Sequence, residues 1–204
     1  MLTLETFKKM VVVAALDIRS GEKYFSELDA AAGGDGDHGT AIVTAFNAMV
    51  KAQGVDFKGY IKALTDALQN EACGSTSTLF GAWLQGMSDA APEGATELDA
   101  AAVAVVFKGG LDEIGLMTRA RVGDKTLMDA LIPATEALVA AVSEGPVVMM
   151  CRSAKAAEDG SAATAAMRAR FGRAKNLGER SIGPRDAGSA SMACIFQAFA
   201  KTLK

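Results

Sequence analysis

The stretch Ile61–Leu68, which reads IKALTDAL, shows the pattern that decides the fold of this chain. Its apolar side chains recur every three or four residues, so Ile61, Leu64 and Leu68 fall on one face of an α-helix. The same spacing recurs along most of the chain, for example between Leu131 and Val142, whereas strand-like alternation is scarce. The sequence therefore predicts an all-α protein.

Eight helices are expected from this spacing, and no strand is predicted. Their residues are 4–28, 39–53, 57–72, 77–90, 97–117, 125–144, 147–170 and 187–203. Because the chain shows no internal repeat and no linker, residues 1–204 are expected to form a single domain. Hydrophobic residues make up 50% of the chain and aromatic residues 6%, so the expected core consists mainly of Ala, Leu, Val and Met side chains.

Charge and cysteine content narrow the classes of function. A net charge of −3 gives no basic surface of the kind that binds nucleic acid, so no nucleic-acid partner is expected. The three cysteines lack zinc spacing and indicate reduced thiols in a cytoplasmic protein. The apolar run from Met10 to Leu16 is too short to span a membrane, and no membrane partner is expected.

The connections between the predicted helices differ in length. Three are short, and short connections make neighbouring helices antiparallel. The other four are longer and rich in glycine or charge; they span residues 29–39, 73–76, 118–126 and 172–188. In an up-and-down array these four are the odd-numbered connections, so they emerge at the same end. The topology therefore predicts one functional rim.

The first of these connections contains Gly33–Thr40, which reads GGDGDHGT. Asp35 and Asp37 repel each other, and a third acid, Asp29, lies just upstream; a hard cation such as Mg²⁺ relieves such a cluster. The helix that follows would present its free N–H groups to a phosphate at His38 and Gly39. Together these features predict a nucleotide site.

Simpler interpretations of the same loops stay open at this point. The acidic stretch is also typical of a glycine-rich turn that caps a helix, although EF-hand spacing is excluded because Phe46 stands where a glutamate is required. Residues 73–78 and 123–126 contain ordinary helix caps and turns as well as phosphate-binding patterns. The long stretch 172–188 is either a functional loop or a surface loop with salt-bridged arginines.

Four motifs in chain order carry a resemblance to a known family. They are Gly34–Gly39, Leu79–Gly81, Gly123–Thr126 and Gly172–Gly183, the last of which reads GRAKNLGERSIG. With these motifs the chain resembles the nucleotide-binding L subunit of dihydroxyacetone kinase. The resemblance spans most of the sequence and implies a closed barrel of eight antiparallel helices, with the nucleotide and metal site at one end.

The resemblance also implies cofactors and a partner. ADP or ATP would bind with two Mg²⁺ ions, and a separate K-type subunit would hold a ketose covalently on its own histidine. The phosphoryl group would pass across the subunit interface, so the chain would be active as a kinase only with that partner. The phosphoryl donor would be free ATP or a phosphotransferase-system protein that recharges bound ADP.

The residues that match the family motifs are assigned as follows. Asp29, Asp35 and Asp37 would hold the metal ions, and Asp35, Asp37 and Arg173 would act in catalysis. The nucleotide would be bound by His38, Gly39, Thr40, Ala41, Ser75, Thr76, Thr118, Leu127, Arg173, Asp186, Ala187 and Gly188. His38 is expected to act through its backbone position rather than as a general base.

This chain departs from the family pattern in several places. One extra residue separates Asp29 from the Gly-Asp-x-Asp segment, and we expect a kinked helix end at Ala32–Gly34 to restore the reach of Asp29. Thr118, Leu127 and Ala187 replace the expected Gly, Met and Pro. Two alternative functions remain: a non-catalytic nucleotide- or metal-binding regulatory module, and a nucleotide domain similar to fatty-acid kinases.

Overall fold

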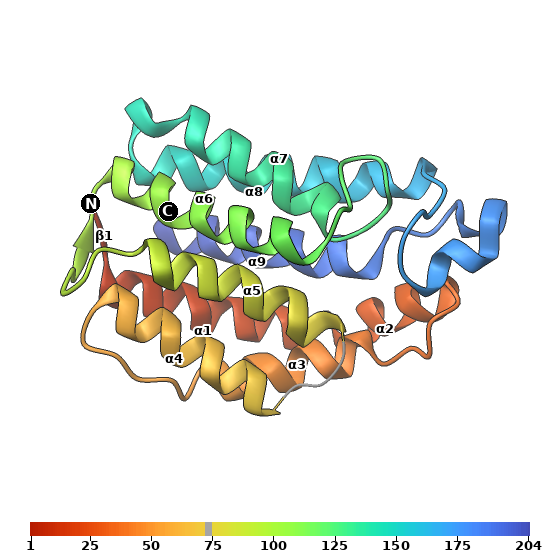
Figure 1. Cartoon of the computed structure of the whole chain (residues 1–204), viewed down its shortest axis with the longest axis horizontal. Coiled ribbons are helices and arrows are strands. Elements are labelled where there is room, and N and C mark those ends of the chain that lie inside the picture. The colour runs from red at the N-terminus through yellow and green to blue at the C-terminus, as the bar shows by residue number, and fades with distance from the viewer. Residues whose placement is uncertain (72–74) are drawn as a thin grey trace.

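The computed structural model describes residues 1–71 and 75–204, without the side chains of residues 75 and 76. Nine α-helices account for most of the described chain (Figure 1). They are α1 (Leu4–Ser20), α2 (Glu22–Ala31), α3 (His38–Met49), α4 (Phe57–Glu71), α5 (Ser75–Ala90), α6 (Ala100–Met117), α7 (Met128–Ala140), α8 (Pro146–Ala163) and α9 (Ala187–Leu203). The all-α prediction is confirmed.

Eight of these helices form a closed barrel, as predicted. From α3 to α9 each helix packs against the next one in sequence, and α1 packs against both α3 and α9, which closes the ring (Figure 1). The additional helix, α2, follows α1 directly and packs against α3 at one end of the barrel. Over the described chain, no helix is long and apolar enough to cross a membrane.

Several predicted boundaries were wrong. The predicted helix 4–28 is divided at Gly21, where a Cβ would lie 2.7 Å from the Phe25 ring. The predicted helix 147–170 ends at Ala163, because the Thr164 hydroxyl donates to the carbonyl of Ser161 (2.6 Å) and a 3-10 turn, η2 (Thr164–Ala166), follows. The predicted helix 125–144 covers only Met128–Ala140 and is followed by a second 3-10 turn, η1 (Val142–Glu144).

One short strand pair was not predicted. Strand β1 (Leu2–Thr3) pairs antiparallel with β2 (Glu97–Leu98), and Leu2 and Leu98 are both buried. Two residues are too few to show the alternation by which a strand is recognised. The pair closes the end of the barrel that also carries the chain termini (Figure 1).

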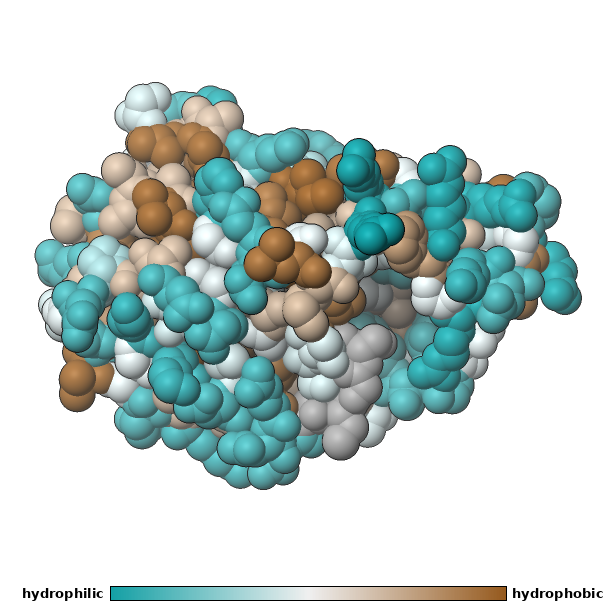
Figure 2. Space-filling view, viewed as in Figure 1, coloured by the Kyte–Doolittle hydropathy of each residue, from teal (hydrophilic) through white to brown (hydrophobic). Residues whose placement is uncertain are grey.

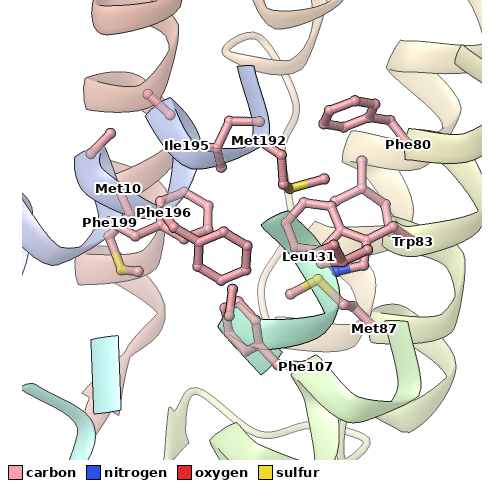
Figure 3. Packing of buried hydrophobic residues seen from close by; sticks show 14 of the residues in the cluster. Met10, Phe80, Trp83, Met87, Phe107, Leu131, Met192, Ile195, Phe196 and Phe199 are labelled. Atoms are coloured by element: carbon pink, nitrogen blue, oxygen red, sulfur yellow. The ribbon is translucent and has the colours of Figure 1, made fainter. Parts of the chain in front are cut away.

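The barrel is filled by side chains from facing helices, and aromatic rings occupy its centre (Figure 3). The Phe107 ring lies 6.0 Å from that of Phe196 and 6.3 Å from that of Trp83, measured between centroids. Phe196 and Phe199 come from α9 and lie 6.3 Å apart. The expectation of a mainly aliphatic core was therefore incomplete, because the few aromatic residues converge where the helices face one another.

Two helices approach each other closely through glycine. A Cβ on Gly86 in α5 would clash with the Gly109 carbonyl of α6, whereas a Cβ on Gly115 in α6 would meet nothing within 4 Å. We expect Gly86→Ala to lower the free energy of unfolding by about 1–3 kcal/mol, the usual cost of overpacking. Gly115→Ala is the matched control and should raise it by about 0.5–1 kcal/mol. Urea denaturation of both variants tests the prediction, and equal stability would contradict it.

The elaborate connections lie at the end of the barrel opposite the termini (Figure 1). This holds for the α2–α3, α6–α7 and α8–α9 connections, the last of which contains the 3-10 segment η3 (Arg173–Ser181). The predicted connection 73–76 falls largely outside the described residues. The surface of this end is mostly hydrophilic on the face shown in Figure 2. The described connections therefore meet at one rim, as the topology predicts.

Candidate functional site

Three carboxylates meet at the rim. Oxygen atoms of Asp29, Asp35 and Asp37 lie within 4.8 Å of one another; Asp35 and Asp37 are exposed and Asp29 is half-buried. All the donor atoms are carboxylate oxygens, which is the donor chemistry that Mg²⁺ requires. The side chains present therefore fit a magnesium ion.

The end of α2 explains how Asp29 reaches this cluster. Gly33 has a φ of +77°, and the N–H groups of Gly33 and Gly34 donate to the carbonyls of Ala30 (3.0 Å) and Asp29 (2.9 Å). This is the Schellman arrangement that ends a helix at a left-handed glycine. The Asp29 carboxylate then accepts from the Gly36 N–H at 2.8 Å. The extra residue is thus absorbed by the helix end, and Asp29 remains beside Asp35 and Asp37.

Charge is unevenly shared within the cluster. The guanidinium of Arg173 lies 2.5 Å from the Asp35 carboxylate, and this hydrogen bond lowers the pKa of Asp35. The pKa of Asp37 is raised, chiefly by its hydrogen bond with Asp35 and then by burial. The guanidinium of Arg173 therefore links the acidic loop that carries Asp35 to η3. The three carboxylates still outnumber this one positive charge.

The first turn of α3 carries four predicted nucleotide contacts. The His38 ring is buried, lies 3.0 Å from the Ser191 hydroxyl, and burial lowers its pKa. Gly39 faces α2, where a Cβ would clash with the Glu22 carbonyl. The Thr40 hydroxyl donates to the Glu22 carboxylate at 3.2 Å. The side chains of His38 and Thr40 therefore contact protein, and the Ala41 N–H donates to the carbonyl of Asp37 at 2.9 Å. The backbone of His38–Thr40 is thus the part suited to a phosphate.

A pocket of about 200 Å³ lies beside the acidic cluster. Seven of the predicted residues line it: Asp29, His38, Leu127, Arg173, Asp186, Ala187 and Gly188. Asp35, Asp37, Gly39, Thr40, Ala41 and Thr118 do not line this pocket. Thr118 instead ends α6, and its hydroxyl accepts from the Ala120 N–H at 3.1 Å. The side chains of Ser75 and Thr76 lie outside the described residues.

Two buried charged residues beside the pocket were missed by sequence reasoning. Asp129 is completely buried and accepts from the N–H groups of Gly123 (2.6 Å) and Thr126 (2.7 Å). Lys125 is 2% exposed and lines the pocket. The motif Gly123–Thr126 drew attention to this turn, but its pattern does not reveal that the lysine points inward.

Asp186 begins α9 at the base of the pocket. Its carboxylate accepts from the Ser189 N–H at 2.7 Å, and protein surrounds it on most sides while part of the residue faces the pocket. Burial raises the pKa of Asp186 to about 7. The Asp186 carboxyl therefore keeps its proton up to about pH 7 in the folded state, whereas in the unfolded state it loses the proton near its ordinary pKa of 3.8.

This pKa predicts a pH dependence of stability with a defined sign. Between about pH 4 and pH 7 the folded state holds more protons at Asp186 than the unfolded state. The stabilisation that this bound proton gives is therefore lost as the pH rises through that window. Asn preserves the helix cap. We expect the wild-type free energy of unfolding, relative to that of Asp186→Asn, to fall by about 1–3 kcal/mol from pH 5 to pH 8. Urea titrations at several pH values test this; a pH-independent difference would contradict it.

Fold and site together define an all-helical barrel protein with a carboxylate cluster and an adjoining pocket at one rim. The chain belongs to the DAK2 domain family, whose model matches residues 32–201. It is 32% identical to the ADP-binding subunit DhaL of the PEP-dependent dihydroxyacetone kinase of Escherichia coli, over 92% of each chain.

Some of the other relatives are longer proteins. The chain is 32% identical to D-erythrulose kinase of Mycolicibacterium smegmatis over 86% of its own length, and the matched part is 31% of that relative. In fold it resembles the dihydroxyacetone kinase from C. freundii in complex with AMP-PNP and Mg²⁺. The TM-score is 0.74 and the identity 22%, over 95% of this chain and 33% of the other. The chain thus spans about a third of the length of these relatives.

Proposed function

We propose that this chain is the nucleotide-binding phosphotransferase subunit of a kinase for short ketoses such as dihydroxyacetone. The observation that carries the proposal is the cluster of Asp29, Asp35 and Asp37 at the edge of the rim pocket, with Arg173 bound to it. Membership of the DAK2 domain family and relatives named as dihydroxyacetone and erythrulose kinases support it. In this proposal residues 1–204 act as one cytoplasmic domain.

Each part of the site would have a separate task. Asp29, Asp35 and Asp37 would hold two Mg²⁺ ions, which would neutralise charge on the phosphates of ADP or ATP. The backbone N–H groups at the start of α3 would bind phosphate oxygens, and Arg173 would stabilise charge that develops on the transferred group. Leu127 and Asp186–Gly188 would contact the rest of the nucleotide, because they line the pocket side by side.

The ketose would be held by a partner. His38 is the only histidine of the chain, and its buried ring faces Ser191, so it is not placed to capture a carbonyl group. A separate K-type subunit, or an equivalent domain, would supply the covalent ketose site. In the longer relatives this would correspond to part of the two thirds that the present chain does not match.

Activity with and without a partner tests the proposal. The chain alone is expected to phosphorylate neither dihydroxyacetone nor erythrulose, and addition of a K-type subunit should restore phosphorylation in a coupled assay. Phosphorylation by the isolated chain would contradict the need for a partner. Binding of Mg-nucleotide without any activity in the reconstituted pair would favour the alternative of a regulatory module.

The phosphoryl donor is a separate question with its own measurement. The similarity to PEP-dependent ADP-binding subunits favours ADP that stays bound and is recharged by a phosphotransferase-system protein. The purified chain is then expected to retain ADP through gel filtration, which mass spectrometry after denaturation would detect. Rapid exchange of ADP would instead indicate that free ATP is the donor.

A further inference from the structure

Lys125 has an unusual environment for a lysine. Its side chain is buried, and its Nζ donates to the carbonyls of Thr164 (2.6 Å) and Pro184 (2.5 Å). Among the described residues Nζ forms no ion pair, and the carboxylates of Asp186 and Asp129 act on it from farther away. Because desolvating an ammonium is costly, these two charge-assisted hydrogen bonds indicate that the side chain is held in one position.

The backbone of Lys125 points to the same conclusion. Its φ is +60°, and it is the only residue other than glycine with a positive φ in the described chain. The left-handed conformation favours glycine and costs backbone energy for a residue with a Cβ. A lysine at this position therefore needs side-chain contacts that outweigh the strain, and the two carbonyls provide them.

These contacts join two segments that line the pocket side by side. Lys125 belongs to the turn that leads to Thr126 and Leu127, whereas the carbonyl of Pro184 lies two residues before Asp186. Thr164 adds a second tie, since its hydroxyl accepts from the Asp186 N–H at 2.9 Å. The two segments pack against each other, because a Cβ on Gly188 would lie 3.3 Å from the Cβ of Leu127.

We propose that Lys125 is a positioning residue of the nucleotide site: it holds the segments Thr126–Leu127 and Asp186–Gly188 together as one wall of the pocket. The proposal rests on the proposed function, which places the nucleoside part of ADP against this wall. The phosphate part would lie at Asp29–Ala41 and Arg173, and none of the contacts described for those residues involves Lys125. Lys125 should therefore control affinity for the whole nucleotide and not affinity for its phosphates.

Two probes separate these affinities. Mg-ADP carries both parts, whereas Mg-pyrophosphate carries only the phosphates, and isothermal titration calorimetry measures each dissociation constant. Lys125→Met keeps the apolar stem and removes both hydrogen bonds. We expect it to weaken Mg-ADP binding by about 10–100-fold, the range for loss of charge-assisted hydrogen bonds. Binding of Mg-pyrophosphate should change by less than about threefold.

Two further variants complete the experiment, one as a control for loss of stability and one that keeps the positive charge. Thr65→Val removes a buried hydroxyl that donates to Ile61 at 3.0 Å in α4, away from the pocket; it should lower the melting temperature without changing either affinity. Lys125→Arg keeps the charge on a bulkier, planar group, and it should lose less Mg-ADP affinity than Lys125→Met. It also serves as the test variant if the methionine variant does not fold.

The outcomes are distinct. Unchanged Mg-ADP affinity in a folded Lys125 variant, or a parallel loss of both affinities, would overturn the positioning role. A selective loss of Mg-ADP affinity with Mg-pyrophosphate retained would support it. If the wild-type chain binds Mg-pyrophosphate but not Mg-ADP, the proposed function itself fails, and the role of Lys125 fails with it.

Discussion

Asp37→Asn is expected to weaken the binding of Mg-ADP by at least about a hundredfold while the fold persists. Loss of a residue that only orients a metal ligand already costs about 10–100-fold in metal affinity, and Asp37 is proposed to be a ligand itself. Its oxygen atoms lie in the cluster with those of Asp29 and Asp35. Asp37 is exposed and its pKa is raised by Asp35, so removal of its charge should relieve repulsion and leave stability unchanged or higher.

Calorimetry and thermal melting measure the two halves of this prediction. Asp66→Asn is the matched control, because Asp66 is also exposed and, within the described part of the chain, its ion pair is with Lys62 on α4 at 3.1 Å. Asp35→Asn should lose affinity as well, but it also removes the partner of Arg173, which makes Asp37 the cleaner test. Wild-type Mg-ADP affinity in both Asp35→Asn and Asp37→Asn would refute the metal assignment.

Arg173→Ala is expected to lower turnover of the reconstituted kinase by about 10–100-fold without preventing association of the subunits. A charge-assisted contact to phosphate that forms in the transition state has an effect of this size. Arg173 is 59% exposed in its pair with Asp35, and exposed ion pairs contribute little to stability. The fold should therefore be unaffected, and the loss should appear in kcat more than in the affinity for the partner.

Arg173→Lys and Arg152→Ala sharpen this experiment. Lysine keeps the charge but not the planar fork, so it should recover part of the rate if charge dominates and little if the fork is needed. Arg152 on α8 pairs with Glu144 of η1 at 2.6 Å and is similarly exposed, so its removal should leave turnover unchanged. Wild-type turnover in Arg173→Ala would rule out the catalytic assignment.

The sequence predicted the helices and the rim because both depend on local patterns. Apolar spacing marks each helix, and the alternation of short and long connections places the long ones at one end. The reach of Asp29 was also predictable, since Gly33 and Gly34 allow the helix to end sharply. Thr118 was assigned from resemblance alone, and the structure shows its hydroxyl bound to Ala120 outside the pocket.

What could not be predicted depends on contacts between distant parts of the chain. Lys125 bonds to carbonyls that are 39 and 59 residues away, and backbone carbonyls leave no trace in a sequence pattern. The end of α8 also involves a distant contact, because the hydroxyl of Thr164 accepts a hydrogen bond from the N–H of Asp186 in another loop. The break at Gly21 is different, because it is local: the ring of Phe25, four residues further on, fills the space beside the glycine.

Closure of the ring by α9 has a consequence for how the molecule folds. Most neighbouring helices are also neighbours in sequence, so they can assemble through local contacts, whereas α1 and α9 meet across nearly the whole chain; Lys201 and Asp17 pair across 184 residues. Contacts of such long sequence separation form slowly, because the loop entropy is lost before the contacts form. We expect docking of α9, with Phe196 and Phe199, to be the late and rate-limiting step, so that a chain still lacking this helix exposes an apolar seam and needs protection from aggregation.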